Sequence, residues 1–159
     1  MADTSPWPNL CKEPAEWVDG NERAFLGPVA YFGALPRDAM ERGISTPGDN
    51  GPRIYAAFGT IIWRYWTAEA LQALEAIAEA MAALPGATLN VGLGGANLSG
   101  ADLEPLRRRG AVVHDFADQW AALRNADVLV THHGLGSTHE AVACGVPMLS
   151  LPFFWDQPG

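Results

Sequence analysis

Short apolar runs alternate with amphipathic segments from residue 53 onward, and this alternation predicts a parallel α/β sheet. The five expected strands are residues 54–58, 88–93, 111–113, 127–130 and 146–151. The expected helices lie between them, at residues 67–84, 99–109, 120–124 and 137–143. Strands that alternate with helices in this way are typical of a doubly wound, Rossmann-like sheet, so the predicted fold class is α/β.

The expected helices carry start and stop signals. Thr67 is the expected N-cap of the longest helix, and Pro85-Gly86 ends it. Ser99 and Asp102 fit a capping box for the next helix, and Gly145 closes the last one. One face of the longest helix is apolar at helical spacing: Leu71, Leu74, Ile77, Ala78, Met81 and Leu84.

Residues 1–52 have a different composition. Seven of the twelve prolines precede Gly59, and glycine is frequent in the same stretch. We therefore expect residues 1–52 to be loop and interdomain linker, with short ordered pieces at residues 25–26 and 29–32. The sheet is expected in residues 53–159.

Composition narrows the classes of partner and compartment. A net charge of −8 argues against nucleic acid or an anionic membrane surface as a partner. The two cysteines, Cys11 and Cys144, provide no disulfide framework. Residues 1–10 carry Pro6 and Pro8 and no apolar run, so we do not expect them to be a signal peptide, and no apolar run in the sequence approaches transmembrane length. The expected location is the cytoplasm.

The segment from Val128 to Glu140 has the pattern of a phosphate site. A buried strand runs through small and glycine residues into a helix that is expected to start near Ser137. The free backbone N–H groups of a helix N-terminus, with the helix dipole, favour phosphate. Glu140 lies one turn further on, where its carboxylate can accept hydrogen bonds from a ribose, and Asp156-Gln157 follows the next strand. Together these features suggest a pocket for a nucleotide sugar.

The positions of the polar residues support the same pocket. Open parallel sheets bind ligands outside the carboxyl ends of their strands, where the winding reverses. Four candidate segments follow expected strand ends: Gly59-Thr60, Phe116, residues 132–137 and Asp156-Gln157.

Several residues also have a simpler structural interpretation. Ser137 and Glu140 alone satisfy a capping box. His132, His133 and His139 with Glu140 lack the spacing of a zinc helix, so a metal site is not expected. We expect His133 and His139 to pack in the fold or to lie on the surface.

Two further patterns have alternatives. Gly92-Leu-Gly-Gly95 lacks the spacing of a dinucleotide fingerprint. The aromatic residues Trp63, Tyr65 and Trp66 are expected to pack against the first helix, and the alternative is that they line an acceptor cleft.

The motifs in order resemble the donor-binding signature of the UDP-dependent glycosyltransferases, which have the two-domain GT-B fold. The matching pieces are Phe116-Ala-Asp-Gln119, Thr131-His-His-Gly-Leu-Gly-Ser-Thr-His-Glu140, Gly145-Val-Pro147 and Asp156-Gln157. Tyr55-Ala-Ala-Phe-Gly-Thr60 is similar to the family's first strand and turn, which includes Gly59 and Thr60. The chain departs from many plant members at Leu135 and Gly136, where those carry tryptophan and asparagine.

The resemblance implies a role for each matched position. His132 and Ser137 would contact phosphate, within a turn that includes Gly134, Gly136 and Thr138. Glu140 would accept from the ribose hydroxyls, beside Gln119. The Phe116 ring would stack on uracil while the Ala117 backbone reads the base edge, and Asp156-Gln157 would bind a hexose.

The resemblance also implies an activity. An inverting enzyme of this family transfers a hexose, here expected to be glucose, from a UDP-sugar to a hydroxyl of a small lipophilic acceptor. No metal or other cofactor is expected, because the helix N-terminus and His132 balance the charge of the UDP leaving group. The family's catalytic base lies in an N-terminal acceptor domain to which no part of this chain corresponds. We therefore expect a partial protein that is inactive alone: residues 1–52 as linker and residues 53–159 as a donor-binding domain, the C-terminal half of a GT-B fold, incomplete at its C-terminus.

Two alternatives stay open. The first is a naturally short nucleotide-sugar-binding subunit that needs a separate acceptor-domain partner. The second is a GT-B-fold epimerase of a UDP-N-acetylhexosamine, which the Asp156-Gln157 ending disfavours.

Overall fold

The computed structural model describes residues 9–11, 14–21, 29–31 and 50–154. The chain divides into two compact units, residues 1–40 and 41–159. In the first unit, strand β1 (Asn9–Cys11) pairs in parallel with β2 (Val29–Tyr31), and a 3-10 helix, η1 (Ala15–Trp17), lies between them in sequence. The strand β2 falls within one of the two short ordered pieces expected before residue 53; the other, at residues 25–26, lies outside the described residues. The proposed division into a linker and a donor domain at residue 53 stays a prediction.

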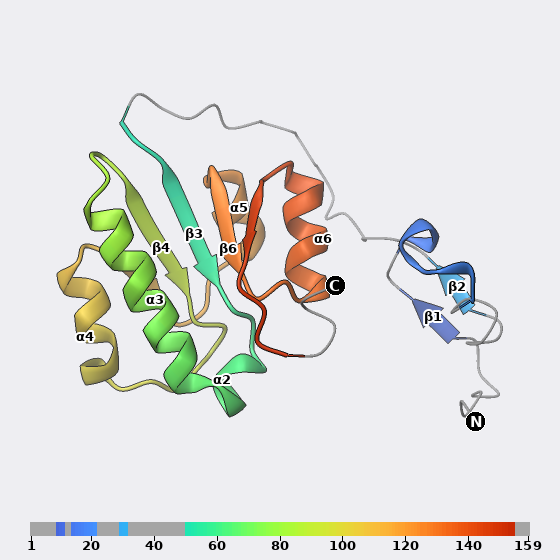
Figure 1. Cartoon of the computed structure of the whole chain (residues 1–159), viewed down its shortest axis with the longest axis horizontal. Helices are drawn as coiled ribbons and strands as arrows, with labels where there is room; N and C mark the ends of the chain where they lie inside the picture. The colour runs from blue at the N-terminus through green and yellow to red at the C-terminus, as the bar shows by residue number, and fades with distance from the viewer. Residues whose placement is uncertain (1–8, 12–13, 22–28, 32–49, 155–159) are drawn as a thin grey trace. The chain divides into compact units, whose positions relative to one another are not determined.

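The second unit contains a five-stranded parallel sheet in the order β5-β4-β3-β6-β7. Its strands are β3 (Arg53–Ala57), β4 (Thr88–Gly92), β5 (Val112–His114), β6 (Val128–Thr131) and β7 (Met148–Ser150). Its helices are α2 (Ile62–Tyr65), α3 (Thr67–Ala82), α4 (Gly100–Arg108), α5 (Gln119–Arg124) and α6 (Leu135–Cys144). The chain adds β4 and then β5 on one side of β3, and β6 and then β7 on the other; Figure 1 shows β4 and β6 on either side of β3. The prediction of a doubly wound α/β sheet is confirmed.

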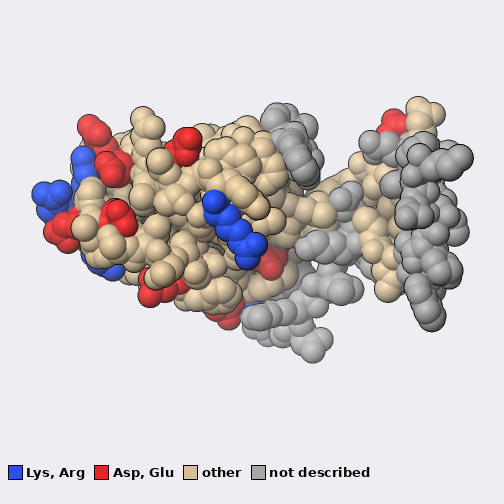
Figure 2. All heavy atoms as spheres, turned by 90° about the horizontal axis from the view of Figure 1, so that it is seen from below, with Lys and Arg blue, Asp and Glu red and all other residues tan. Residues whose placement is uncertain are grey.

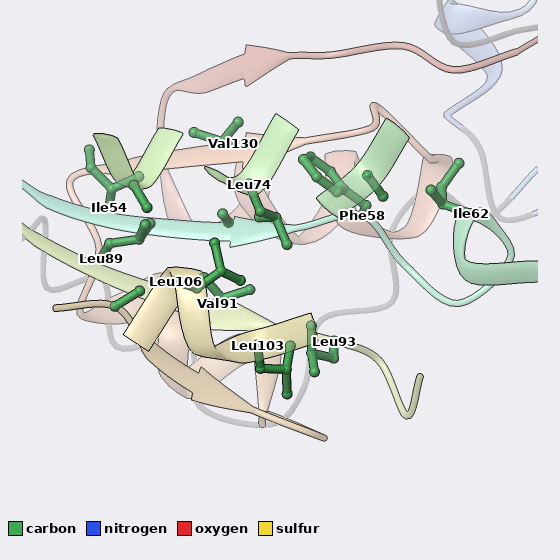
Figure 3. Close-up of a cluster of buried hydrophobic side chains, with 14 residues drawn as sticks. Ile54, Phe58, Ile62, Leu74, Leu89, Val91, Leu93, Leu103, Leu106 and Val130 are labelled. Carbon is green, nitrogen blue, oxygen red and sulfur yellow. The ribbon is translucent and has the colours of Figure 1, made fainter. Parts of the chain in front are cut away.

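Alternating side chains of the central strand β3 build two cores. Ile54, Ala56 and Phe58 point to one face of the sheet, where α3 and α4 cover them. Figure 3 shows this cluster, in which Leu74 of α3 and Leu103 and Leu106 of α4 meet the strand residues. Tyr55 and Ala57 point to the opposite face and pack with Leu123 of α5 and Ala141 of α6. Both faces of the sheet are therefore covered, which explains why β3 is apolar at almost every position.

The helix ends agree with the sequence at α4 and differ at α3. Ser99 and Asp102 form the expected capping box, since the Ser99 hydroxyl accepts from Asp102 N and the Asp102 carboxylate accepts from Ser99 N. The Ser99 hydroxyl also donates to the Asp102 carboxylate, and this bond together with the one from Ser99 N holds the pKa of Asp102 below its ordinary value. The expectation that Thr67 caps α3 is wrong. Thr67 is the first helical residue, and its hydroxyl donates to the Trp63 carbonyl at 2.6 Å because the unpredicted helix α2 precedes it directly.

An ion pair joins the starts of β3 and β6. The Asp127 carboxylate accepts from the backbone N of Arg53 at 2.8 Å, from Nε at 3.1 Å and from Nη2 at 2.7 Å. The Asp127 side chain is only 8% exposed. The pair therefore secures the two neighbouring strands at the end of the sheet opposite the candidate site.

Figure 2 shows acidic and basic side chains scattered over one face, without an extended basic area. Among the helices that the structure describes, none has the length and apolar character to cross a membrane.

Candidate functional site

The candidate residues gather at the carboxyl edge of the sheet, where its winding reverses. The strands β3 and β6 are neighbours in the sheet, yet the chain visits β4 and β5 between them. Gly59-Thr60 follows β3, and residues 132–134 follow β6. Ligands of doubly wound sheets bind at this reversal point. The expected position of these two segments is confirmed.

The N-terminus of α6 opens onto this edge. The helix begins at Leu135 with Gly134 as its N-cap, two residues before the expected start at Ser137. No side chain caps it, and its first turn carries no acidic residue. The N–H groups of Leu135, Gly136 and Ser137 have no acceptor four residues back within the helix. This end of α6 can therefore donate to an anion.

Ser137 and Glu140 meet through Gln119. The Gln119 side-chain amide donates to Ser137 Oγ at 3.1 Å and to Glu140 Oε2 at 2.7 Å. Ser137 is the third residue of α6, so the interpretation of Ser137 and Glu140 as a capping box is wrong. The structure instead joins three residues of the signature in one polar cluster. Thr138 has a local role, because its hydroxyl donates to the Gly134 carbonyl at 3.2 Å.

One edge of the His132 imidazole lies beside two glycines. A Cβ placed on Gly59 would lie 2.8 Å from His132 Cε1 and 3.1 Å from Nε2. A Cβ placed on Gly134 would overlap the same ring. The turns after β3 and β6 thus both leave room for the Cε1–Nε2 edge of the histidine, beside the start of α6.

Phe116 and Ala117 lie on the loop that leads from β5 into α5. Phe116 is 78% exposed, which leaves its ring accessible for stacking. Both residues border a hollow of about 400 Å³ on the α5 side of the sheet, which is also lined by Tyr55, Asn90 and His114. Asp118 caps α5, since its carboxylate accepts from Ala121 N at 3.2 Å. The cap fixes the point from which Gln119 reaches toward α6.

Tyr55 belongs to this neighbourhood although the motif analysis did not include it as a ligand residue. Burial, followed by the negative charges of the nearby Glu140 and Asp118 carboxylates, raises the pKa of Tyr55 to about 12. The tyrosine therefore stays neutral in the physiological range. The sequence feature that could have pointed to this residue is a tyrosine, with its polar hydroxyl, inside the apolar run of β3.

The remaining histidines do not form a metal site in the part of the chain that the structure describes. His139 is buried at 4% exposure within α6, and His133 has a left-handed backbone with φ of 64°. The described residues contain no group of three or more His, Cys, Asp or Glu side chains that could hold a metal. The expectation that binding needs no metal stays a prediction.

The glycine run after β4 has a packing role. Gly94 has φ of 60°, and a Cβ there would lie 2.7 Å from the Gly59 carbonyl oxygen. The glycine at this position lets the turn after β4 approach the turn after β3. Packing of the two turns therefore explains the glycine at position 94, and no dinucleotide-binding role is needed to explain it.

The aromatic residues after Thr60 mainly pack. Trp66 stacks on Phe154 with ring centroids 4.6 Å apart and an interplanar angle of 6°. Trp63 packs against the core on the α3 side, whereas Tyr65 is 70% exposed. The ring of Phe153 meets Phe58 edge-on at 5.3 Å. The predicted sugar-binding pair, Asp156 and Gln157, lies just beyond and outside the described residues.

Comparison with known proteins agrees with this geometry. Residues 28–159 match the family model of UDP-glucoronosyl and UDP-glucosyl transferase. A doubly wound sheet with an open helix N-terminus at its reversal point is a nucleotide-binding architecture. The chain belongs to the UDP-glucuronosyl and UDP-glucosyl transferase family.

Individual relatives and structures give the extent of the likeness. The zeaxanthin glucosyltransferase of Pantoea ananas is 35% identical over 68% of this chain and 24% of its own length. That of Pseudescherichia vulneris is 31% identical over 89% of this chain and 32% of its own length. The chain thus spans about a quarter to a third of these relatives.

Solved glycosyltransferases share the fold. The calicheamicin glycosyltransferase superposes with a TM-score of 0.65, covering 94% of this chain and 36% of its own, at 21% identity. The UDP-glucose:anthocyanidin 3-O-glucosyltransferase superposes with a TM-score of 0.62, covering 93% of this chain and 36% of its own, at 22% identity. The chain therefore has the fold of part of a GT-B glycosyltransferase.

Proposed function

We propose that this chain binds the UDP-sugar donor of an inverting glycosyltransferase at the carboxyl edge of β3 and β6. The observation that carries the proposal is the uncapped N-terminus of α6 beside His132, at the point where the sheet reverses. Backbone N–H groups that point at one place can stabilise the negative charge of a diphosphate and of a departing UDP. His132 and Ser137 add side-chain donors at the same place.

The other signature residues divide the rest of the donor between them. The Glu140 carboxylate accepts from the ribose hydroxyls, and Gln119 holds Glu140 and Ser137 in register at 2.7 and 3.1 Å. Phe116 offers an exposed ring for uracil, with the Ala117 backbone beside it. Asp156 and Gln157 bind the hexose. No metal is required, since the N–H groups at the N-terminus of α6 and the His132 side chain stabilise the negative charge of the diphosphate.

The relatives support glucose as the sugar. Two of them are zeaxanthin glucosyltransferases, which favours a hydroxyl of a lipophilic small molecule as the acceptor. Because the matched segment makes up 24% and 32% of those enzymes, we propose that it supplies donor binding. Acceptor binding and the catalytic base then belong to a separate domain or partner subunit.

Calorimetry with UDP tests the phosphate site. We expect weak binding that His132→Ala and Ser137→Ala each reduce by about tenfold or more, because hydrogen bonds to charged groups contribute about 1.5–3 kcal/mol. His133→Asn is the matched control, since asparagine tolerates the left-handed backbone at that position and the adjacent side chain has no proposed role. Unchanged affinity in both test variants, or an equal loss in the control, would contradict the phosphate site.

Glu140→Gln tests ribose recognition separately. The amide oxygen can still accept from Gln119, so the melting temperature should stay within about 2 °C of the wild type. UDP affinity should fall by about tenfold, because hydrogen bonds to an ionised carboxylate are roughly twice as strong as those to a neutral amide. A fall in melting temperature with unchanged UDP affinity would show that Glu140 serves only the packing of α5 on α6.

A further inference from the structure

Three turns meet beside the imidazole of His132: the turn after β4 approaches the turn after β3, and the turns after β3 and β6 border the ring. Gly94, after β4, approaches the Gly59 carbonyl oxygen so closely that a Cβ would lie 2.7 Å from it. Gly59, after β3, and Gly134, after β6, both border the Cε1–Nε2 edge of the His132 ring. These strands are neighbours in the sheet, in the order β4, β3, β6. This edge of the ring therefore lies in a slot, the space that Gly59 and Gly134 leave open because they have no side chains.

The two glycines that border the ring differ in their own conformation. Gly59 has φ of 68°, in the left-handed region that favours glycine by itself. Gly134 has φ of −68° and ψ of 141°, which any amino acid adopts. A side chain is also allowed at an N-cap, where serine, threonine, aspartate and asparagine are common. Backbone geometry thus gives no reason for glycine at position 134, whereas the position of the His132 ring does.

We infer that Gly134 is a positioning residue, which fixes the His132 imidazole beside the start of α6 by leaving room for the ring. A methyl group at position 134 would overlap Nε2 and Cε1, so the ring would have to move by roughly 1 Å or more, a displacement that can cost about 10²-fold where groups must be aligned. Gly59 leaves room for the same Cε1–Nε2 edge of the ring. The position of the imidazole therefore depends on the absence of a side chain at position 134.

The functional part of this inference rests on the proposed binding of UDP. A hydrogen-bonding side chain such as His132 that is held in place before UDP binds needs no reorganisation when negative charge builds up on the phosphate. Gly134 thus acts on the ligand only through His132. The two residues must then behave as one unit in a double-mutant cycle.

The experiment compares the wild type with Gly134→Ala, His132→Ala and the double variant, all in the full 159-residue chain. UDP affinity should fall about tenfold or more in each single variant, and the double variant should lie within about threefold of His132→Ala. Multiplied losses, or wild-type affinity in Gly134→Ala, would overturn the inference.

Thermal unfolding gives a second readout that needs no ligand. Gly134→Ala should lower the melting temperature when His132 is present. In the His132→Ala background the same substitution should leave it unchanged or raise it, because the space is then empty and alanine restricts the unfolded chain more than glycine does. A decrease of equal size in both backgrounds would overturn the slot. If Gly134→Ala does not fold, recovery of folded protein in the double variant supports the slot and continued failure contradicts it.

Gly100→Ala is the matched control for the exchange itself. Gly100 is the first residue of α4, and a Cβ there meets nothing within 4 Å. This substitution should not depend on His132 in either readout. If no variant and no wild-type chain binds UDP, the proposed function fails, while the unfolding cycle still decides whether Gly134 positions the ring.

Discussion

Replacing Phe58 with alanine is expected to destabilise the chain by about 3–5 kcal/mol, the usual cost of emptying a buried aromatic site. Phe58 is fully buried at the end of β3, among residues of α3, and its ring meets Phe153 edge-on at 5.3 Å. The substitution removes both the burial and the ring pair. Chemical denaturation followed by tryptophan fluorescence measures the loss.

Leu84→Ala is the control for the same kind of truncation on the surface. Leu84 is 48% exposed just after α3, so its truncation should cost less than about 1 kcal/mol. Similar losses for the two variants would show that Phe58 is not part of the central core. Because Gly59 follows Phe58 directly, a folded Phe58→Ala chain should also bind UDP more weakly, through a displaced turn rather than a lost contact.

Asp127→Ala is expected to cost about 2 kcal/mol or more, because it leaves the Arg53 backbone N–H without its acceptor and removes a charge-assisted pair. The carboxylate is 8% exposed and accepts three hydrogen bonds from one residue. Glu104→Ala provides the exposed comparison. Its nearest atom pair with Arg108 is 3.9 Å long, and both side chains are more than half exposed, so we expect a change below about 0.5 kcal/mol. Equal effects would contradict a structural role for the Asp127 pair.

The Asp127 pair also predicts a dependence on pH. The hydrogen bonds from Arg53 hold the pKa of Asp127 below its ordinary value. A carboxyl group whose pKa is lowered by folding contributes fully above the pKa of the unfolded chain, about 4, and loses its contribution as the pH falls through the lower folded pKa. The difference in stability between wild type and Asp127→Asn should therefore be constant from about pH 7 to 5 and shrink below about pH 4. A difference that stays constant down to pH 3 would contradict the assignment.

The strands were predictable because their signal is local. Each of the five strands of the sheet lies at an apolar run that the sequence shows by itself. Only the strand ends differ, by one or two residues, as at β7, which covers Met148–Ser150 instead of 146–151. The capping box of α4 was equally predictable, since Ser99 and Asp102 are three residues apart. Such short spacings need no knowledge of the rest of the fold.

The start of α6 was not predictable in the same way. Ser137 and Glu140 have the spacing of a capping box, and the local rule places the helix start at Ser137. In the structure the helix begins at Leu135, and Ser137 Oγ is occupied by Gln119, 18 residues away. A tertiary contact thus replaced the local one. The aromatic cluster shows the same effect, because Trp66 stacks on Phe154, a residue far away in the sequence.

The sequence by itself determined the α/β alternation, the sheet-edge position of the candidate residues and the family signature. These follow from periodicity and from short spacings along the chain. Only the tertiary structure decided that Gln119 joins Ser137 to Glu140 and that Asp127 binds Arg53, 74 residues away, at the start of β3. It also decided that position 134 needs a glycine, because a side chain there would overlap the imidazole of His132. The reason is physical: the last three depend on which backbone segments touch, and a chain acquires those contacts only when its sheet has formed.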